Sequence, residues 1–322
     1  MTNYTVDTLE LGPFTTESGE FISNLKLRYE HVGLKGQPLV VVCHALTGNH
    51  LTYGTNENPG WWRGIIDGGY MPVNDYQFLT FNVIGSPYGS SSALTDANFP
   101  ESLTLRDIVR AIELGIETLG FERINILIGG SLGGMQAIEL LYNRKFNVEK
   151  AVILAATDKT SSYSRAFNEI ARQAIHLDNK EGMSIARQLG FLTYRSSKSY
   201  DKRFSPNQVV TYQKHQGNKF MNHFDSLCYL TLLDVLDSHD VDRGRNDVDE
   251  VFSNLDTKVM TMGFTDDLLY PDDLVCAVGN RFKYHKHFFV PDNVGHDGFL
   301  LNVNDWAPNL YHFLKVYKIK RK

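Results

Sequence analysis

The segment INILIGGSLGGMQAIE, residues 124–139, contains the pattern on which the fold interpretation rests. It begins with an apolar run typical of a buried strand, and an amphipathic helical pattern starts at Leu132. Gly129, Ser131 and Gly133 stand between the two in the order G-x-S-x-G. This pattern is typical of a nucleophile elbow, in which a serine occupies a strained turn and the glycines let strand and helix approach closely. A structural turn with a capping serine fits the local pattern equally well.

Apolar runs elsewhere extend this picture to a sheet. They predict further strands at residues 38–43, 78–84, 151–155, 258–262 and 286–290, mostly buried on both faces. Helical patterns at 105–119 and 132–142 separate several of the strands, which is typical of a mostly parallel sheet covered by helices on both faces. Residues 8–11 and 25–32, on either side of a turn at Gly19, are expected to add antiparallel strands at one edge.

The strand pattern is interrupted between residues 156 and 249, where polar-rich helical segments follow one another. The first of these, 163–176, is expected to carry its apolar residues along one side. We therefore predict an α/β fold of the α/β-hydrolase type, with a core formed by residues 1–156 and 250–322 and a helical lid inserted at 157–249. A final amphipathic helix at 306–316 is expected to lie on the surface of the core.

Composition and charge exclude several classes of protein. The chain is 42% hydrophobic and 21% charged, as folded globular proteins are, and its net charge of -5 offers no broad attraction for nucleic acid or an anionic membrane. No apolar run approaches the roughly 20 residues that cross a bilayer, and the start of the sequence lacks a signal-peptide pattern. Cys43, Cys228 and Cys276 are odd in number and widely spaced, which fits neither a disulfide framework nor a zinc site. We expect a cytoplasmic protein with reduced thiols and no nucleic-acid or membrane partner.

A serine nucleophile requires a base and an acid further along the chain. Asp266 and Asp267 follow the strand at 258–262, and His296 follows the strand at 286–290. This order, and the position of each residue at the carboxyl end of a strand, match a Ser-Asp-His triad on an α/β-hydrolase sheet. The pattern alone does not choose between the two aspartates.

The remaining histidines are expected to be structural. His44 and His50 flank a loop, and His285 and His287 lie around the start of a strand, so each pair has an alternative interpretation as metal ligands. Because neither pair has an HExxH pattern or nearby paired cysteines, we predict no metal site. The loop at 43–50 follows an early strand, where this fold takes one amide of its oxyanion hole, and Leu132 supplies the other amide.

Beyond the elbow, the sequence resembles the homoserine O-acyltransferases of methionine biosynthesis, most of which transfer acetyl groups. The resemblance extends along nearly the whole chain and rests on CHALTGNH at 43, FNVIGSPYGSS at 81, FPESLTLRDIV at 99, GGSLGGMQAIE at 129, FNEIARQAIHLD at 167, TDDLLYP at 265 and VGHDGFL at 294. The chain departs from the family pattern after Asp178, where the lid segment is shorter, and in the loop at 85–92, which lacks a cysteine common there.

The resemblance implies specific roles for the candidate residues. It makes Ser131 the nucleophile, Asp267 the triad acid and His296 the base, gives the oxyanion-hole amides to Leu46 and Leu132, and assigns Arg172 and Asp297 to the amino-acid substrate. It also implies acetyl-CoA as co-substrate, L-homoserine as acceptor, no bound cofactor and a homodimer. An exposed helix charge is the alternative for Arg172.

Three alternatives to this function remain open from the sequence. A serine esterase of the same fold would share the triad and use water as acceptor. A related transferase would use a succinyl donor or a serine acceptor. A binding protein without activity is disfavoured because all three triad positions are filled.

Overall fold

An eight-stranded sheet runs through the computed structural model, which describes residues 3–291 and 294–316. Its strand order is β1-β4-β6-β5-β7-β8-β9-β10. The bounds are β1 (Asn3–Glu10), β4 (Lys26–Gly33), β5 (Leu39–Cys43), β6 (Gln77–Phe81), β7 (Arg123–Gly130), β8 (Asn147–Leu154), β9 (Lys258–Phe264) and β10 (Tyr284–Val290). Strand β4 pairs antiparallel with both β1 and β6, and every pair from β6 to β10 is parallel. The predicted mostly parallel sheet with an antiparallel edge is confirmed.

One detail of the predicted sheet is wrong, and one is more elaborate than predicted. Strand β10 was expected to be mostly buried, but in the described sheet it pairs only with β9, and most of its residues are partly exposed because it forms the edge. The turn at Gly19 is present between the antiparallel strands β1 and β4, with φ 89° at the glycine. The connection that contains it also forms β2 (Phe14–Thr15) and β3 (Phe21–Ile22), a separate two-stranded sheet that was not predicted.

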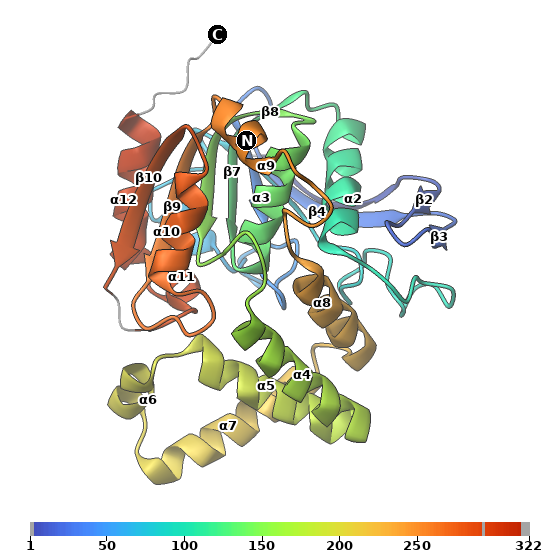
Figure 1. Cartoon of the computed structure of the whole chain (residues 1–322), viewed down its shortest axis with the longest axis vertical. Coiled ribbons are helices and arrows are strands. Elements are labelled where there is room, and N and C mark those ends of the chain that lie inside the picture. Colours follow the sequence, from blue (N-terminus) through green and yellow to red (C-terminus); the bar gives the residue numbers. More distant parts are fainter. Residues whose placement is uncertain (1–2, 292–293, 317–322) are drawn as a thin grey trace.

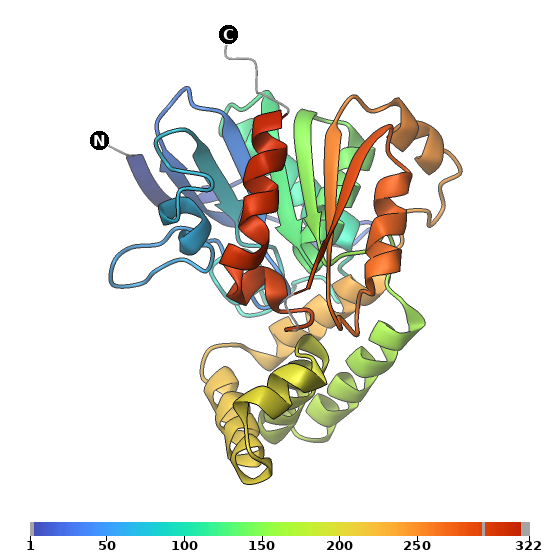
Figure 2. The same cartoon turned by 90° about the vertical axis from the view of Figure 1, so that its left-hand side faces the viewer.

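Helices cover both faces of the sheet. Residues of α2 (Leu105–Thr118), α3 (Leu132–Asn143), α9 (Val248–Asn254) and α10 (Asp272–Asn280) contribute to the apolar cluster on one face. Residues of α1 (Arg63–Asp67), α11 (Gly298–Leu301) and α12 (Val303–Val316) contribute to the cluster on the other. Figure 2 shows α12, in red, lying across the strands. The carboxyl ends of the parallel strands therefore remain the open edge of the core.

The segment between β8 and β9 lies at that edge. It contains α4 (Ser162–Leu177), α5 (Asn179–Tyr194), α6 (Ser197–Arg203), α7 (Pro206–Met221) and α8 (Ser226–Ser238), and Figure 1 shows α4 to α7 projecting away from the sheet. The predicted helix at 163–176 is present as α4. Asp178 marks the boundary to α5, because its carboxylate accepts the amides of Lys180 and Glu181 at the helix start. The use of residues 157–249 as a lid stays a prediction.

Two further features bear on the expectations from composition. All three cysteines are free thiols, and Cys43 and Cys228 are buried. Within the part of the chain that the structure describes, no helix combines the length and apolarity needed to cross a membrane.

Candidate active site

Ser131 occupies the turn between β7 and α3. Its backbone has φ 56° and ψ -127°, a conformation that costs a non-glycine residue on the order of 1–3 kcal/mol. The Ser131 amide donates to the carbonyl of Leu154 at 2.9 Å, which ties the turn to the neighbouring strand β8. The Ser131 side chain makes no helix-capping hydrogen bond. The strained turn therefore presents the hydroxyl to other partners.

Both glycines of the elbow pattern are required by close packing. A Cβ atom at Gly129 would overlap the carbonyl group of Gly133, and one at Gly133 would overlap the carbonyl group of Cys43. Strand β7, helix α3 and the end of β5 thus meet at distances that only glycine permits. The glycines of the G-x-S-x-G pattern are therefore required by the close packing of this turn.

Ser131, His296 and Asp267 form one hydrogen-bonded chain. His296 Nε2 lies 2.9 Å from Ser131 Oγ, and His296 Nδ1 lies 2.9 Å from Asp267 Oδ2. Because the ionised carboxylate only accepts, Nδ1 donates to Asp267 and Nε2 is left to accept the serine proton. Asp267 Oδ1 accepts the amides of Leu269 and Tyr270 at 2.9 and 3.0 Å, which fixes the carboxylate. The side chains of Ser131, Asp267 and His296 are all buried.

The neighbouring Asp266 is placed differently. Its backbone has φ 59°, and its side chain turns toward solvent, where it pairs with Lys198 at 3.1 Å. Only Asp267 of the two aspartates therefore contacts His296.

The surroundings of His296 favour its charged form. Burial by itself lowers the pKa of the imidazole, but the charge and hydrogen bond of Asp267, together with the charge of Asp297, outweigh burial and raise the pKa above 6.5. The rings of Tyr270 and Tyr194 lie 5.2 and 5.7 Å from the imidazole ring and shield it from solvent. The carboxylates of Asp267 and Asp297 therefore stabilise the protonated imidazole.

The loop after β5 lies beside the elbow and is held by His44. The Val83 amide donates to His44 Nε2 at 3.0 Å, so His44 Nδ1 carries the proton and donates to the carbonyl of Ala45 at 2.8 Å. Burial lowers the pKa of His44 to about 4, which keeps this ring neutral. The expected loop-shaping role of His44 is confirmed by these contacts.

Leu46 lies in this loop, and Leu132 begins α3. Among the described residues, no hydrogen bond is found for the amide of either one. An amide at the first position of a helix has no acceptor inside the helix, and it lies at the positive end of the helix dipole. The amide of Leu132, directly after Ser131, and that of Leu46, which lines the same cavity as Ser131, thus have no acceptor within the described protein.

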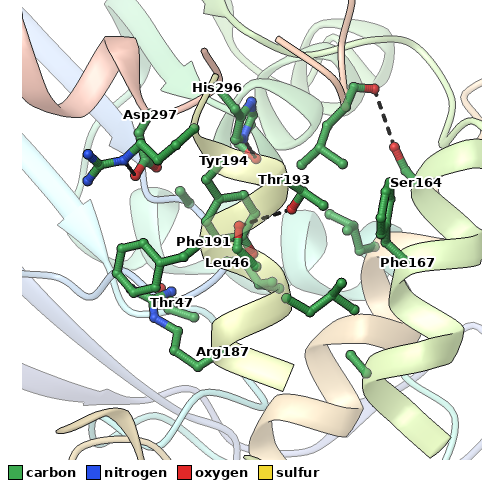
Figure 3. A pocket seen from close by; sticks show the side chains of 18 of the residues that line it. Leu46, Thr47, Ser164, Phe167, Arg187, Phe191, Thr193, Tyr194, His296 and Asp297 are labelled. Carbon is green, nitrogen blue, oxygen red and sulfur yellow. Dashed lines mark hydrogen bonds and ion pairs between the residues drawn. The ribbon is translucent and has the colours of Figure 1, made fainter. Parts of the chain in front are cut away.

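A cavity of about 270 Å³ opens beside Ser131 and His296. The core contributes the loop around Leu46 and the segment that follows His296, and α4, α5 and α8 contribute the opposite wall. Most lining side chains are apolar or aromatic. Figure 3 shows Phe167 on one side of the cavity and Phe191 and Tyr194 on α5.

Besides His296, the described residues that line this apolar cavity include three charged side chains: Arg187, Arg195 and Asp297. Arg195 Nε donates to Asp297 Oδ2 at 2.7 Å. Arg187 instead lies over the rings of Phe191 and Phe220, 4.5 and 4.8 Å from their centroids. No ion pair is found for Arg187 among the residues that the structure describes. Of the two arginines in the cavity, Arg195 is therefore paired with a carboxylate of the protein and Arg187 is not.

Comparisons with known proteins agree with this geometry. The family model of the alpha/beta hydrolase fold matches residues 38–303. A homoserine O-acetyltransferase of Geobacter sulfurreducens is 32% identical over 92% of this chain and 93% of its own length. The crystal structure of homoserine O-acetyltransferase from Staphylococcus aureus is 77% identical with a TM-score of 0.96, covering 99% of this chain and 98% of that one.

This chain belongs to the homoserine O-acetyltransferase family. Its fold also extends beyond that family. The structure of esterase E22 superimposes with a TM-score of 0.84 over 97% of this chain and all of its own, at 17% identity. That likeness concerns the fold alone, so the members of the homoserine O-acetyltransferase family are the informative relatives for function.

The position of Arg172 corrects one prediction made from the family resemblance. Arg172 is not among the described residues that line the cavity. Its guanidinium faces a surface groove, where it pairs with Glu169, Asp234 and Asp237 at 2.9, 2.9 and 2.7 Å. Three carboxylates already surround this arginine, so it does not face the same space as Asp297. The alternative interpretation of Arg172 as a structural helix charge fits these contacts.

Sequence reasoning missed Arg187 and Arg195. One signal for Arg187 was available, since no acidic residue lies three or four positions away on its helix, whereas Arg172 has Glu169 three positions before it. For Arg195 no local signal exists, because its partner Asp297 lies 102 positions away. Asp297 itself lines the cavity, as expected of a substrate-binding residue.

The other histidine pair is also engaged within the fold. The hydroxyl of Thr261 lies 2.8 Å from both His285 Nε2 and His287 Nδ1, and His287 Nε2 lies 2.9 Å from Asp272. Among the described residues no cluster of three or more His, Cys, Asp or Glu side chains has the arrangement of a metal site. His285 and His287 therefore act in the packing of α10 against β9 and β10.

Proposed function

We propose that this chain transfers an acetyl group from acetyl-CoA to the hydroxyl of L-homoserine, through an acetyl-Ser131 intermediate, in methionine biosynthesis. The observation that carries the proposal is the hydrogen-bonded chain Ser131–His296–Asp267 beside a cavity with separate positive and negative groups. The triad geometry supports acyl transfer through serine. The two charges suit an acceptor that is itself an amino acid.

In the first half-reaction, Ser131 Oγ attacks the thioester carbonyl carbon while its proton passes to His296 Nε2. The amides of Leu46 and Leu132 stabilise the negative charge that develops on the carbonyl oxygen. The C–S bond then breaks, His296 returns the proton to sulfur, and CoA leaves as a thiol. Asp267 keeps the imidazole in the tautomer that accepts at Nε2 and stabilises the imidazolium.

In the second half-reaction, His296 removes the proton of the homoserine hydroxyl, whose oxygen attacks the acetyl-serine ester. The C–O bond to Ser131 breaks, and His296 gives the proton back to Ser131 Oγ. Arg187 binds the acceptor carboxylate through its planar guanidinium, and Asp297 binds the ammonium group. Arg187 thereby takes the role that the family resemblance had assigned to Arg172.

Water competes with homoserine for the acetyl-enzyme, so the site must exclude it. We propose that residues 157–249 serve as the lid that does so. Helices α4, α5 and α8 of this segment already provide one wall of the cavity, with apolar residues such as Phe167 and Phe191. The same proposal includes a homodimeric assembly, a cytoplasmic location and no bound cofactor, all of which the family resemblance implies.

A thiol-release assay separates this function from its alternatives. Acetyl-CoA and succinyl-CoA are each mixed with L-homoserine, L-serine or no acceptor, and free CoA is followed with a thiol reagent. We expect sustained release only with acetyl-CoA and L-homoserine, and a single turnover without acceptor. Equal steady-state release without any acceptor would make the chain a hydrolase that uses water. Preference for the other donor or acceptor would reassign the substrate while keeping the mechanism.

A further inference from the structure

Residues 194–198, at the junction of α5 and α6, contact both loops that carry the triad acid and base. The Asp297 amide donates to the carbonyl of Tyr194 at 2.9 Å, and the Ser196 amide donates to the carbonyl of Val294 at 2.7 Å. Gly295, with φ 91°, sits so close that a Cβ there would approach the Ser196 amide at 2.8 Å. The end of α5 is thus joined to the His296 loop on both sides of the histidine.

Two ion pairs reinforce this connection, and they differ in burial. Arg195 and Asp297 are only 12% and 14% exposed, and they are joined at 2.7 Å. Lys198 and Asp266 are 66% and 38% exposed, at 3.1 Å. An exposed pair contributes little because solvent screens it, whereas removing one member of a shielded pair leaves a charge without its partner. The Arg195–Asp297 pair is the one that can influence the site.

We propose that Arg195 is a positioning residue for acyl transfer, which holds the Asp297 carboxylate beside His296 and balances its negative charge. This inference rests on the proposed triad chemistry. Arg195 contacts Oδ2 of Asp297, so it orients the carboxylate that the acceptor ammonium group is to bind. It acts through Asp297 and needs no contact with the reacting atoms.

The charge balance around His296 gives the proposal a measurable signature. The groups that face the imidazole are Asp267 from the loop after β9, the hydroxyl of Ser131, the rings of Tyr270 and of Tyr194 from α5, and Asp297. Asp297 raises the pKa of His296, and a positive charge beside Asp297 opposes that effect. Removing the positive charge should therefore raise the pKa of His296 further, and removing Asp297 should lower it.

The experiment measures the pH dependence of Ser131 acylation with p-nitrophenyl acetate, followed by the release of nitrophenol. This probe requires only the triad, so it works whether the acceptor is homoserine or water. The variants are Arg195→Gln, Arg195→Lys, Asp297→Asn and the double variant Arg195→Gln with Asp297→Asn. Lys198→Gln is the matched control, since it removes an equal charge from the same junction of α5 and α6. Thermal unfolding of each variant verifies folding.

We expect Arg195→Gln to shift the acid limb of the pH–rate profile to higher pH by about half a unit or more, because a nearby positive charge is lost. Asp297→Asn should shift the limb to lower pH. The double variant and Arg195→Lys should lie close to wild type, as should Lys198→Gln. With acetyl-CoA as donor, Arg195→Gln should also raise the KM for homoserine at least about tenfold, as expected for misplacing a charged partner. Acylation at the pH plateau should be nearly unchanged.

Two results would overturn the proposal. One is an acid limb for Arg195→Gln that shifts no further than that of Lys198→Gln. The other is a loss of rate at every pH without any shift of the limb, which would assign Arg195 to folding alone. If the enzyme released CoA without homoserine and the variants still showed the expected shifts, homoserine would be refuted as the acceptor. The role of Arg195 would be retained.

Discussion

Replacing Arg187 with methionine tests how the cavity recognises its acceptor. Methionine keeps an unbranched apolar side chain against the rings of Phe191 and Phe220, which lie 4.5 and 4.8 Å from the guanidinium, and it removes the charge. A change in activity then reports the loss of the guanidinium rather than a collapse of the wall.

The size of the effect follows from the bonds that the acceptor would lose. Each hydrogen bond to a charged group contributes about 1.5–3 kcal/mol, and a carboxylate in a guanidinium fork accepts two. Because Arg187 is half-buried, we take the lower end, about 3 kcal/mol in total. At about 1.4 kcal/mol per factor of ten, kcat/KM for L-homoserine should fall by about a hundredfold.

The assay separates the two half-reactions. Acetylation of Ser131 by acetyl-CoA, followed by intact-protein mass spectrometry, should proceed at nearly the wild-type rate in Arg187→Met, while transfer to homoserine slows. Arg172→Met is the matched control: it breaks three ion pairs outside the cavity, so it should lower thermal stability and leave the KM for homoserine within a few-fold of wild type. If Arg172→Met impaired transfer and Arg187→Met did not, the placement of the acceptor carboxylate would be refuted.

Other predictions concern the triad. Ser131→Ala should remain folded and form no acetyl adduct by mass spectrometry, and Ser131→Gly should in addition unfold at a higher temperature, because glycine adopts φ 56° without the strain of about 1 kcal/mol. Asp267→Asn should reduce turnover by about four orders of magnitude through the wrong histidine tautomer. Asp266→Asn should reduce it only a few-fold, and a larger loss for Asp266 would exchange the two roles. Because His296 acts as a base when neutral and its pKa lies above 6.5, acylation should decline as the pH falls through that pKa, and a rate that stays constant down to pH 6 would contradict the assignment.

Much of the fold could be predicted because local patterns and global packing agree here. The run at 124–128 is apolar because β7 is buried between β5 and β8, and the glycines at 129 and 133 are required by contacts that only the folded turn creates. The triad order was also readable, since each residue follows its own strand at the same edge of the sheet. In these places the strand and the residues that follow it lie in one stretch of sequence, so the local pattern indicates their position in the sheet.

Other features depend on which elements happen to be neighbours. Strand β10 has an apolar pattern similar to that of buried strands, but its exposure depends on the absence of a strand beyond it in the described sheet. The choice between Asp266 and Asp267 depends on a left-handed backbone at Asp266, which turns its side chain toward Lys198. Neither fact is contained in the local composition.

The two arginines show this limit most clearly, because the same four residues, IARQ, surround both. They occur at 170–173 on α4 and at 185–188 on α5, and in each copy the alanine, Ala171 or Ala186, is buried against the cavity. The arginine that follows is rotated by about 100° around its helix in either case, so what it meets depends on the next helix. On α4 the next helix is α8, whose Asp234 and Asp237 bind the guanidinium. On α5 the next helix is α7, whose Phe220 packs against the guanidinium of Arg187. This ring accepts no conventional hydrogen bond, so the donors of Arg187 are left for a ligand. The partner helices therefore decide that Arg172 is held in ion pairs and that Arg187 keeps its donors for the ligand proposed above. The tetrapeptide is the same around both arginines, so it does not distinguish the two.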